Sequence, residues 1–128
     1  GHHPTEVAAV IATARKVWPE AIIVMVYQPH RYSRTSDLFD DFVRVLSELD
    51  ALMLVEVYAA GEAPIAGADS KSLCQAIRQR GGVGPVYAQD PDEALQLLPA
   101  FCAQADVLIV QGAGNVNLIS NNLRQAHV

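Results

Sequence analysis

Several features that define other classes of protein are scarce in this sequence. Nine lysines and arginines stand against fourteen acidic residues, a formal net charge of −5, so the chain lacks the cationic face that nucleic-acid binding requires. No apolar run approaches the roughly 20 residues of a membrane span, and the amino terminus does not have the pattern of a signal peptide. We therefore expect a cytoplasmic protein that binds neither nucleic acid nor membranes.

Cysteine is equally scarce. Cys74 and Cys102 are the only two, each lies in a segment with helical spacing, and no CxxC pair or nearby histidine indicates a metal site. Because nothing else indicates an oxidising compartment, we expect two buried, reduced thiols and no bound metal. A disulfide between them remains the open alternative.

The remaining composition is that of one globular domain. The 128 residues are 51% hydrophobic and 18% charged, and a chain of this length buries roughly two-thirds of its surface on folding. Alternating helical spacing and short apolar runs favour an α/β fold, a three-layer Rossmann-like domain with a mostly parallel sheet. The predicted helices are 4 to about 19, 36–49, 70–80 (capped by Ser70), 91–103 and 117–126, and the predicted strands are 22–27, 51–57, 83–88 and 106–110.

The richest chemistry follows the first predicted strand, in Gln28-Pro29-His30-Arg31-Tyr32-Ser33-Arg34-Thr35. Ligands of such sheets bind beyond the carboxyl ends of the strands, and guanidinium groups bind carboxylate or phosphate through paired hydrogen bonds. This segment predicts an anion site. The alternative is that Arg31 and Arg34 pair on the surface with Asp37, Asp40 or Asp41, and that His30 only satisfies a loop carbonyl. A second candidate, the turn at Gly112-Ala113-Gly114-Asn115, is more typical of tight backbone geometry than of a phosphate cradle.

Segments along the whole chain, taken together, resemble the C-terminal domain of the Mur ligases, in particular the branch that joins L-alanine to UDP-N-acetylmuramate. They are residues 1–6 (GHHPTE), 28–35 (QPHRYSRT), 38–42 (LFDDF), 56–65 (EVYAAGEAPI), 67–70 (GADS) and 110–115 (VQGAGN). The resemblance implies that residues 1–128 form the lid domain of a longer enzyme. The central ATP-binding domain, the N-terminal UDP-sugar domain and the strand that precedes Gly1 in the family are absent from this sequence.

By the same resemblance, the full-length enzyme uses ATP and Mg²⁺ to phosphorylate the UDP-N-acetylmuramate carboxylate, and L-alanine then attacks the acyl phosphate. The lid brings His30, Arg34 and Arg31 to L-alanine and to the transferred phosphoryl group. His2 and His3 face the nucleotide, and Glu62 is a candidate contact for the alanine ammonium. The ATP and Mg²⁺ are held mainly by the missing central domain, so the fragment alone is expected to be inactive.

Several alternatives stay open at this point. The first is that one of the two histidines at the amino terminus only orders the start of the first helix, or that Gly1-His2-His3 is left over from a purification tag. Glu62 is an exposed loop acid with no ligand. Another alternative is that the enzyme is the recycling ligase that adds a whole tripeptide. A third is that the chain is a receiver-type binding module. Such a module needs acidic residues at the carboxyl ends of its strands, whereas Asp50 and Asp106 precede their strands and so lie at the opposite end of the sheet. A sheet edge left exposed by the missing strand also predicts self-association.

Overall fold

The computed structural model describes residues 3–112 of the chain. Its helices are α1 Pro4–Val17, α2 Tyr32–Asp37, α3 Phe39–Leu46, α4 Ser70–Arg80 and α5 Pro91–Phe101. Its strands are β1 Ile23–Gln28, β2 Ala51–Val55, β3 Val86–Ala88 and β4 Val107–Gly112. The predicted alternation of helices and strands is confirmed over this range. The expected last helix and most of the turn before it lie outside the described residues.

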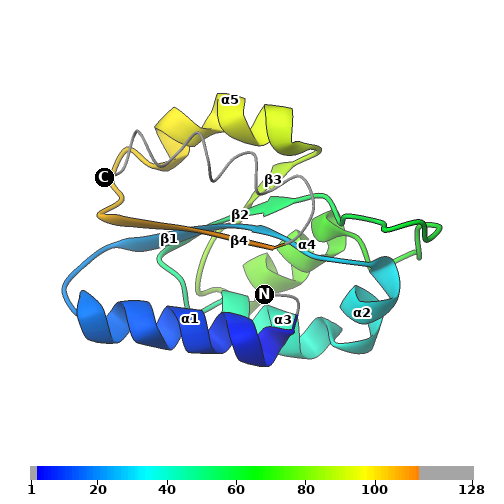
Figure 1. Cartoon of the computed structure of the whole chain (residues 1–128), viewed down its shortest axis with the longest axis horizontal. Helices are drawn as coiled ribbons and strands as arrows, with labels where there is room; N and C mark the ends of the chain where they lie inside the picture. Colours follow the sequence, from blue (N-terminus) through cyan, green and yellow to red (C-terminus); the bar gives the residue numbers. More distant parts are fainter. Residues whose placement is uncertain (1–2, 113–128) are drawn as a thin grey trace.

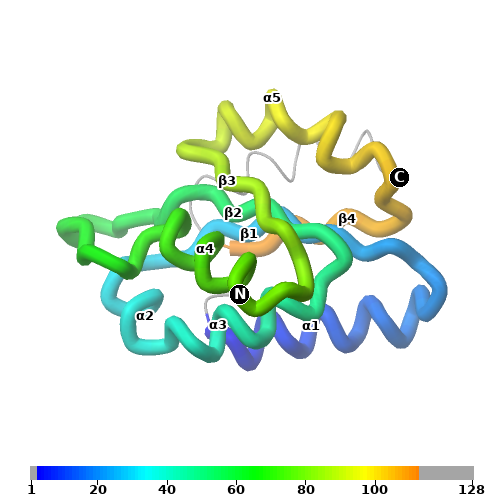
Figure 2. Tube along the Cα trace, turned by 180° about the vertical axis from the view of Figure 1, so that it is seen from behind, coloured from blue at the N-terminus to red at the C-terminus, as the bar shows by residue number. Residues whose placement is uncertain are grey.

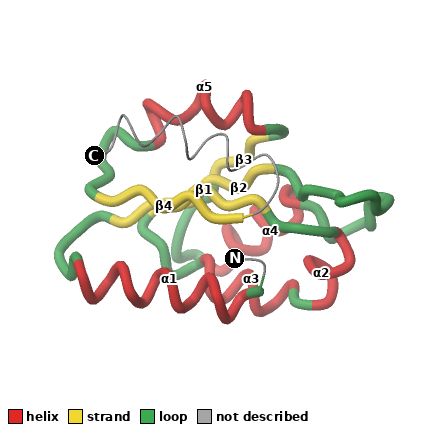
Figure 3. The backbone as a smooth tube through the Cα atoms, in the orientation of Figure 1, coloured by secondary structure: helices red, strands yellow, loops and turns green. Residues whose placement is uncertain are grey.

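The described strands form a single parallel sheet in the order β3-β2-β1-β4. Helices α1, α3 and α4 cover one face and α5 covers the other (Figure 1), so helices and sheet form three layers (Figure 3). The predicted α/β, Rossmann-like architecture is therefore confirmed. No helix among residues 3–112 has the length and apolar character needed to cross a membrane.

The chain reverses its direction across the sheet between β1 and β4. From β1 it moves to β2 and β3 through helices on one face, and it returns to β4 through α5 on the opposite face, as the view from behind shows (Figure 2). At such a point the loops that leave the two neighbouring strands diverge and open a crevice beyond their carboxyl ends. The cationic segment that follows β1 therefore starts at the edge of this crevice.

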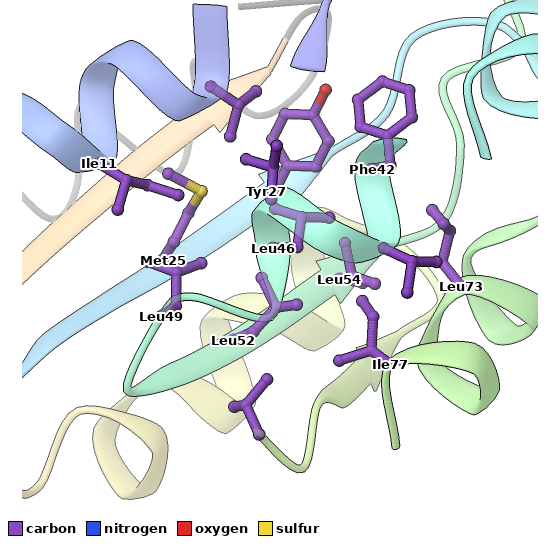
Figure 4. Close-up of a cluster of buried hydrophobic side chains, with 14 of the residues drawn as sticks. Ile11, Met25, Tyr27, Phe42, Leu46, Leu49, Leu52, Leu54, Leu73 and Ile77 are labelled. Carbon is purple, nitrogen blue, oxygen red and sulfur yellow. The ribbon is translucent and has the colours of Figure 1, made fainter. Parts of the chain in front are cut away.

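The core lies on both sides of β1 and β2. Met25, Tyr27 and Leu46 belong to the larger cluster, which packs under α1, α3 and α4 (Figure 4). Val26 and Met53 belong to a smaller cluster under α5. Every residue of β1 is buried, which explains why this strand is a continuous apolar run rather than an alternating one. Burial of each large apolar side chain stabilises the fold by about 1.5–3 kcal/mol. The end of β1 is therefore fixed by the core, and so is the starting point of the residues that follow it.

The largest departure from the predicted elements follows β1. The apolar spacing predicts one helix over residues 36–49, but helix already begins at Tyr32 and a break at Leu38 separates α2 from α3. The Arg31 carbonyl oxygen accepts hydrogen bonds from the backbone N–H of Thr35 and, at 2.9 Å, from its hydroxyl. Polar contacts of this kind stabilise a helical turn without leaving an apolar pattern in the sequence.

The start of α4 also differs from the expectation by one residue. Asp69, not Ser70, is the N-cap, because its carboxylate accepts a hydrogen bond of 2.9 Å from the Ser72 N–H. Ser70 is buried, and its hydroxyl donates to the Val55 carbonyl oxygen at 2.7 Å. Both residue types cap helices well, so the sequence alone does not show that Ser70 instead satisfies the end of β2.

The close approach of β4 to β1 generates a test of the fold. Gly112 pairs with Gln28, has a φ of +135°, and a Cβ built on it would lie 2.5 Å from the Gln28 carbonyl oxygen. We predict that Gly112→Ala lowers the free energy of unfolding by about 2 kcal/mol, because the methyl group strains the backbone and pushes the strands apart. Urea titration measures this. Gly84→Ala is the matched control, since nothing lies within 4 Å of its Cβ position, and equal losses in the two variants would contradict the prediction.

Candidate functional site

The three residues predicted to bind an anion, His30, Arg31 and Arg34, lie together in one pocket at the carboxyl end of β1. The pocket has a volume of about 510 Å³ and is lined by His30, Arg31, Ser33, Arg34, Asp37 and Leu38. All three predicted ligand-binding residues of this segment are therefore brought together. Because α2 starts one residue after Arg31, the two arginines are almost one helical turn apart and reach the same space.

Neither arginine is neutralised by the aspartates that follow it in sequence. Among residues 3–112, no ion pair joins Arg31 or Arg34 to an acidic side chain, whereas Asp41 pairs with Arg44 at 3.2 Å. The alternative in which both arginines pair with the nearby aspartates is therefore not what the structure shows. A pocket lined by two guanidinium groups that form no ion pair among the described residues is suited to a carboxylate or phosphate ligand.

The imidazole ring of His30 forms a hydrogen bond with the guanidinium group of Arg34 at one edge of the ring. The distance from Arg34 Nη1 to His30 Nδ1 is 3.2 Å. A guanidinium nitrogen only donates hydrogen bonds, so Nδ1 is the acceptor, and the proton of the neutral imidazole is on Nε2. The ring also stacks on Tyr58, with centroids 5.7 Å apart and an interplanar angle of 11°. The sequence analysis did not identify Tyr58, whose only signal is its place just after a buried strand.

Arg31 has an unusual backbone conformation, with φ +74° and ψ 134°. A residue with a side chain in this region costs of order 1–3 kcal/mol. Hydrogen bonds hold it there: its N–H donates to the Tyr58 carbonyl oxygen at 2.8 Å, and its own carbonyl oxygen accepts from Thr35. The strain is located at a residue that lines the pocket.

Glu62 lies next to the predicted site but already has partners. Its two carboxylate oxygens accept from the Ser33 hydroxyl at 2.6 Å and from the Ser33 N–H at 3.1 Å. These hydrogen bonds, with a smaller contribution from the positive charge of Arg31, lower the pKa of Glu62 below its ordinary value. Glu62 therefore connects the loop after β2 to the first turn of α2. Its contact with the ammonium of L-alanine stays a prediction.

Glu56, which the sequence analysis did not select as a functional residue, holds both ends of the same loop. One of its oxygens accepts from the N–H groups of Val57 at 2.8 Å and Ser70 at 3.2 Å, and the other accepts from the Tyr87 hydroxyl at 3.0 Å. Burial first, and then this carboxylate, raise the pKa of Tyr87 above its ordinary value. The loop of residues 57–70 is thus closed at its base by one side chain.

Gln28 completes the base of the site. It is only 4% exposed, and its amide nitrogen donates to the Glu56 carbonyl oxygen at 2.9 Å. Its amide oxygen is buried and has no hydrogen-bond partner among the described residues. Gln28 therefore connects the carboxyl ends of β1 and β2 at the level where the pocket begins.

His3 lies at a separate position, at the start of α1. Its Nδ1 accepts a hydrogen bond of 3.1 Å from the Thr5 N–H, so His3 caps the helix. The alternative in which one histidine orders the entry to this helix is thus realised by His3, while His2 lies outside the described residues. A smaller pocket of about 210 Å³ lies beside the cap and includes Arg44 and Asp41. Contact of His3 with a nucleotide stays a prediction.

The other candidate chemistries receive no support from the described residues. No group of three or more histidine, cysteine, aspartate or glutamate side chains among residues 3–112 is arranged to hold a metal ion. Cys74 is a buried free thiol whose pKa is raised to about 11 by burial, and Cys102 is a half-buried free thiol. Asp50 and Asp106 accept from the N–H groups of Ile23 and Ile22, at the amino end of the sheet, away from the crevice where a receiver module needs its acids.

The hydrogen bonds between Glu62 and Ser33 generate a pH-dependent prediction. Since folding lowers the pKa of Glu62, its stabilising contribution is present above the ordinary pKa of about 4.3 and is lost as the pH falls through the lower, folded value. We expect Glu62→Gln to unfold at a lower urea concentration than the wild type at pH 7, and at nearly the same concentration at pH 3. Glu20→Gln, at an exposed glutamate, is the control. A gap that is independent of pH would contradict this role for the Glu62 charge.

Comparisons with known proteins place this geometry in a family. The sequence model of the family described as Mur ligase, glutamate ligase domain, matches residues 1–114. The UDP-N-acetylmuramate-alanine ligase of Thermotoga maritima is 22% identical with a TM-score of 0.67, and the match covers 98% of this chain and 25% of that one. A domain of a putative UDP-N-acetylmuramate:L-alanyl-gamma-D-glutamyl-meso-diaminopimelate ligase from Haemophilus ducreyi is 16% identical with a TM-score of 0.68, over 100% of this chain and 86% of that one. The structural matches show a shared fold. The family match over most of the sequence shows that this chain belongs to the Mur ligase C-terminal domain family.

Proposed function

We propose that this chain is the C-terminal domain of the ATP-dependent ligase that joins L-alanine to UDP-N-acetylmuramate, a cytoplasmic step of peptidoglycan synthesis. The observation that carries the proposal is the pocket after β1, where His30, Arg31 and Arg34 come together and neither guanidinium group has an acidic partner among residues 3–112. The segment QPHRY at residues 28–32 supports L-alanine as the amino acid. The chain spans about a quarter of the length of the Thermotoga ligase it resembles, so the complete reaction requires further domains.

The pocket is suited to the charges of this reaction. The sugar carboxylate attacks the γ-phosphorus of ATP and releases ADP. The alanine amine then attacks the carbonyl carbon of the acyl phosphate, losing a proton and expelling inorganic phosphate. The phosphoryl and acyl oxygens gain negative charge in these steps, and guanidinium and imidazole N–H donors stabilise such charge when they are already oriented. In this proposal Arg31 and Arg34 bind the alanine carboxylate or the phosphoryl oxygens, and His30 donates from Nε2.

The nucleotide and its metal ion would be bound chiefly elsewhere. Bound Mg²⁺ would neutralise phosphate charge, but the described residues contain no carboxylate cluster for it. ATP and Mg²⁺ would therefore be held by the central domain, over which this domain closes as a lid, and the isolated chain would be inactive. His3 would add a contact to the nucleotide: since its Nδ1 caps α1, the proton of its neutral ring is on Nε2.

The recycling ligase that adds a tripeptide is the second candidate. The Thermotoga and Haemophilus structures match this chain with TM-scores of 0.67 and 0.68, so the fold is equally compatible with both enzymes. Phosphate release by the full-length ligase, measured separately with L-alanine and with the tripeptide, distinguishes them. Activity that depends only on the tripeptide would exclude L-alanine as the substrate.

The role of the pocket is tested by removing its donors from the full-length enzyme. We predict that His30→Ala and Arg34→Ala each lower kcat/KM for L-alanine on the order of 100-fold, the usual effect of losing one donor to a developing negative charge. The urea midpoint of each variant should remain close to that of the wild type, because neither side chain belongs to a core cluster.

The control is Arg80→Ala, which removes an exposed arginine from the last turn of α4 and should leave the kinetics unchanged. Wild-type kinetics in both pocket variants would remove the segment of residues 30–34 from the mechanism. An equal loss in the control would show that any missing positive charge has the same effect.

A further inference from the structure

We propose that Tyr58 is a positioning residue for His30, holding the imidazole ring in the orientation from which it acts in the pocket. The inference rests on the proposed function of His30 and extends it to a residue on a different loop. The observation behind it is the parallel stack of the two rings, 5.7 Å between centroids and 11° between planes. That distance is within the range in which aromatic rings attract each other in an offset arrangement.

The surroundings of Tyr58 indicate what its ring packs against. The side chain is 36% exposed and belongs to neither of the two core clusters. The imidazole of His30 is the stacking partner of this partly exposed ring. In this proposal the Tyr58 ring restricts the rotation of the imidazole on which it stacks.

The backbone brings the two rings into register. Tyr58 donates its N–H to the Pro29 carbonyl oxygen, and its own carbonyl oxygen accepts from the Arg31 N–H, both at 2.8 Å. These bonds form a parallel bridge between His30 and Tyr58 beyond the ends of β1 and β2. Since facing residues of neighbouring strands have side chains on the same side of the sheet, the pairing places the two rings next to each other.

The imidazole is thus restrained from two directions. Arg34 donates to Nδ1 on the ring edge at 3.2 Å, and Tyr58 covers a ring face. The edge contact selects the tautomer that is protonated on Nε2, and the face contact limits rotation about the bond to the ring. Without the tyrosine ring the face contact would be lost, and the Arg34 contact on the edge involves a residue that is itself needed for ligand binding in the proposed function.

The loop that carries Tyr58 does not depend on the tyrosine side chain for its own structure. Glu56 binds the N–H groups of Val57 and Ser70 at the two ends of the loop. Glu62 binds Ser33 across the gap to α2, and the bridge to His30 uses only backbone atoms. A substitution of the Tyr58 side chain should therefore change the packing against His30 and leave the loop in place.

The test is a double-mutant cycle in the full-length ligase, with Tyr58→Ala, His30→Ala, the double variant, and Tyr58→Phe as the conservative control. We expect Tyr58→Ala to lower kcat/KM for L-alanine about tenfold, in the same kinetic parameter, kcat or KM, that His30→Ala affects. Tyr58→Phe keeps the flat ring and should remain within about twofold of the wild type. The double variant should be no worse than His30→Ala alone, because a residue that acts only through His30 has nothing left to position.

Each other outcome has a definite meaning. Losses that multiply in the double variant would overturn the inference, because Tyr58 would then act independently of His30. Wild-type kinetics in Tyr58→Ala together with an impaired His30→Ala would also overturn it and would leave the proposed function intact. Wild-type kinetics in both single variants would contradict both. Urea midpoints of all four variants, which we expect to agree with the wild type, exclude unfolding as the cause of any loss.

Discussion

The site depends on the two backbone hydrogen bonds between Tyr58 and the residues on either side of His30. They extend the pairing of β1 and β2 by one bridge, so the chain after β1 leaves the sheet at a fixed point. From there it turns directly into α2, and the side chains of His30, Arg31, Ser33 and Arg34 line one pocket. Because β1 is buried on both faces, this exit point cannot shift without disturbing the core.

Acidic side chains explain how a chain with a net charge of −5 forms a cationic pocket. Asp50 and Asp106 accept backbone N–H groups at the amino end of the sheet, while Glu56, Glu62 and Asp69 accept N–H groups of the loop and helix starts at the carboxyl end. Carboxylates that accept from backbone N–H groups are fixed in place by charge-assisted hydrogen bonds, which are stronger than those between neutral groups. Glu56, Glu62 and Asp69 thus stabilise the loops at the carboxyl end of the sheet, and none of them forms an ion pair with Arg31 or Arg34.

The parts of the structure that the sequence predicts are those that rest on local patterns. The apolar runs of β1 and β2 predict strands covered on both faces, and the position of His30, Arg31 and Arg34 after the first strand predicts their shared pocket. The contacts that hold the pocket together were not predictable in the same way. Glu62 binds a serine 29 residues earlier, and Tyr87 binds a glutamate 31 residues earlier. Such partners become neighbours only through the strand order, so no periodicity marks them.

The backbone of Arg31 is strained, and the strain is at a residue to which we assign a role in ligand binding. A glycine would adopt a φ of +74° without the cost of about 1–3 kcal/mol that a side chain incurs there. The hydrogen bonds to Tyr58 and Thr35 compensate for this cost, but they are formed by the backbone and would be available to glycine as well. What glycine lacks is the guanidinium group that lines the pocket. Under the proposed function, ligand binding by that group is the reason for a non-glycine residue at this strained position.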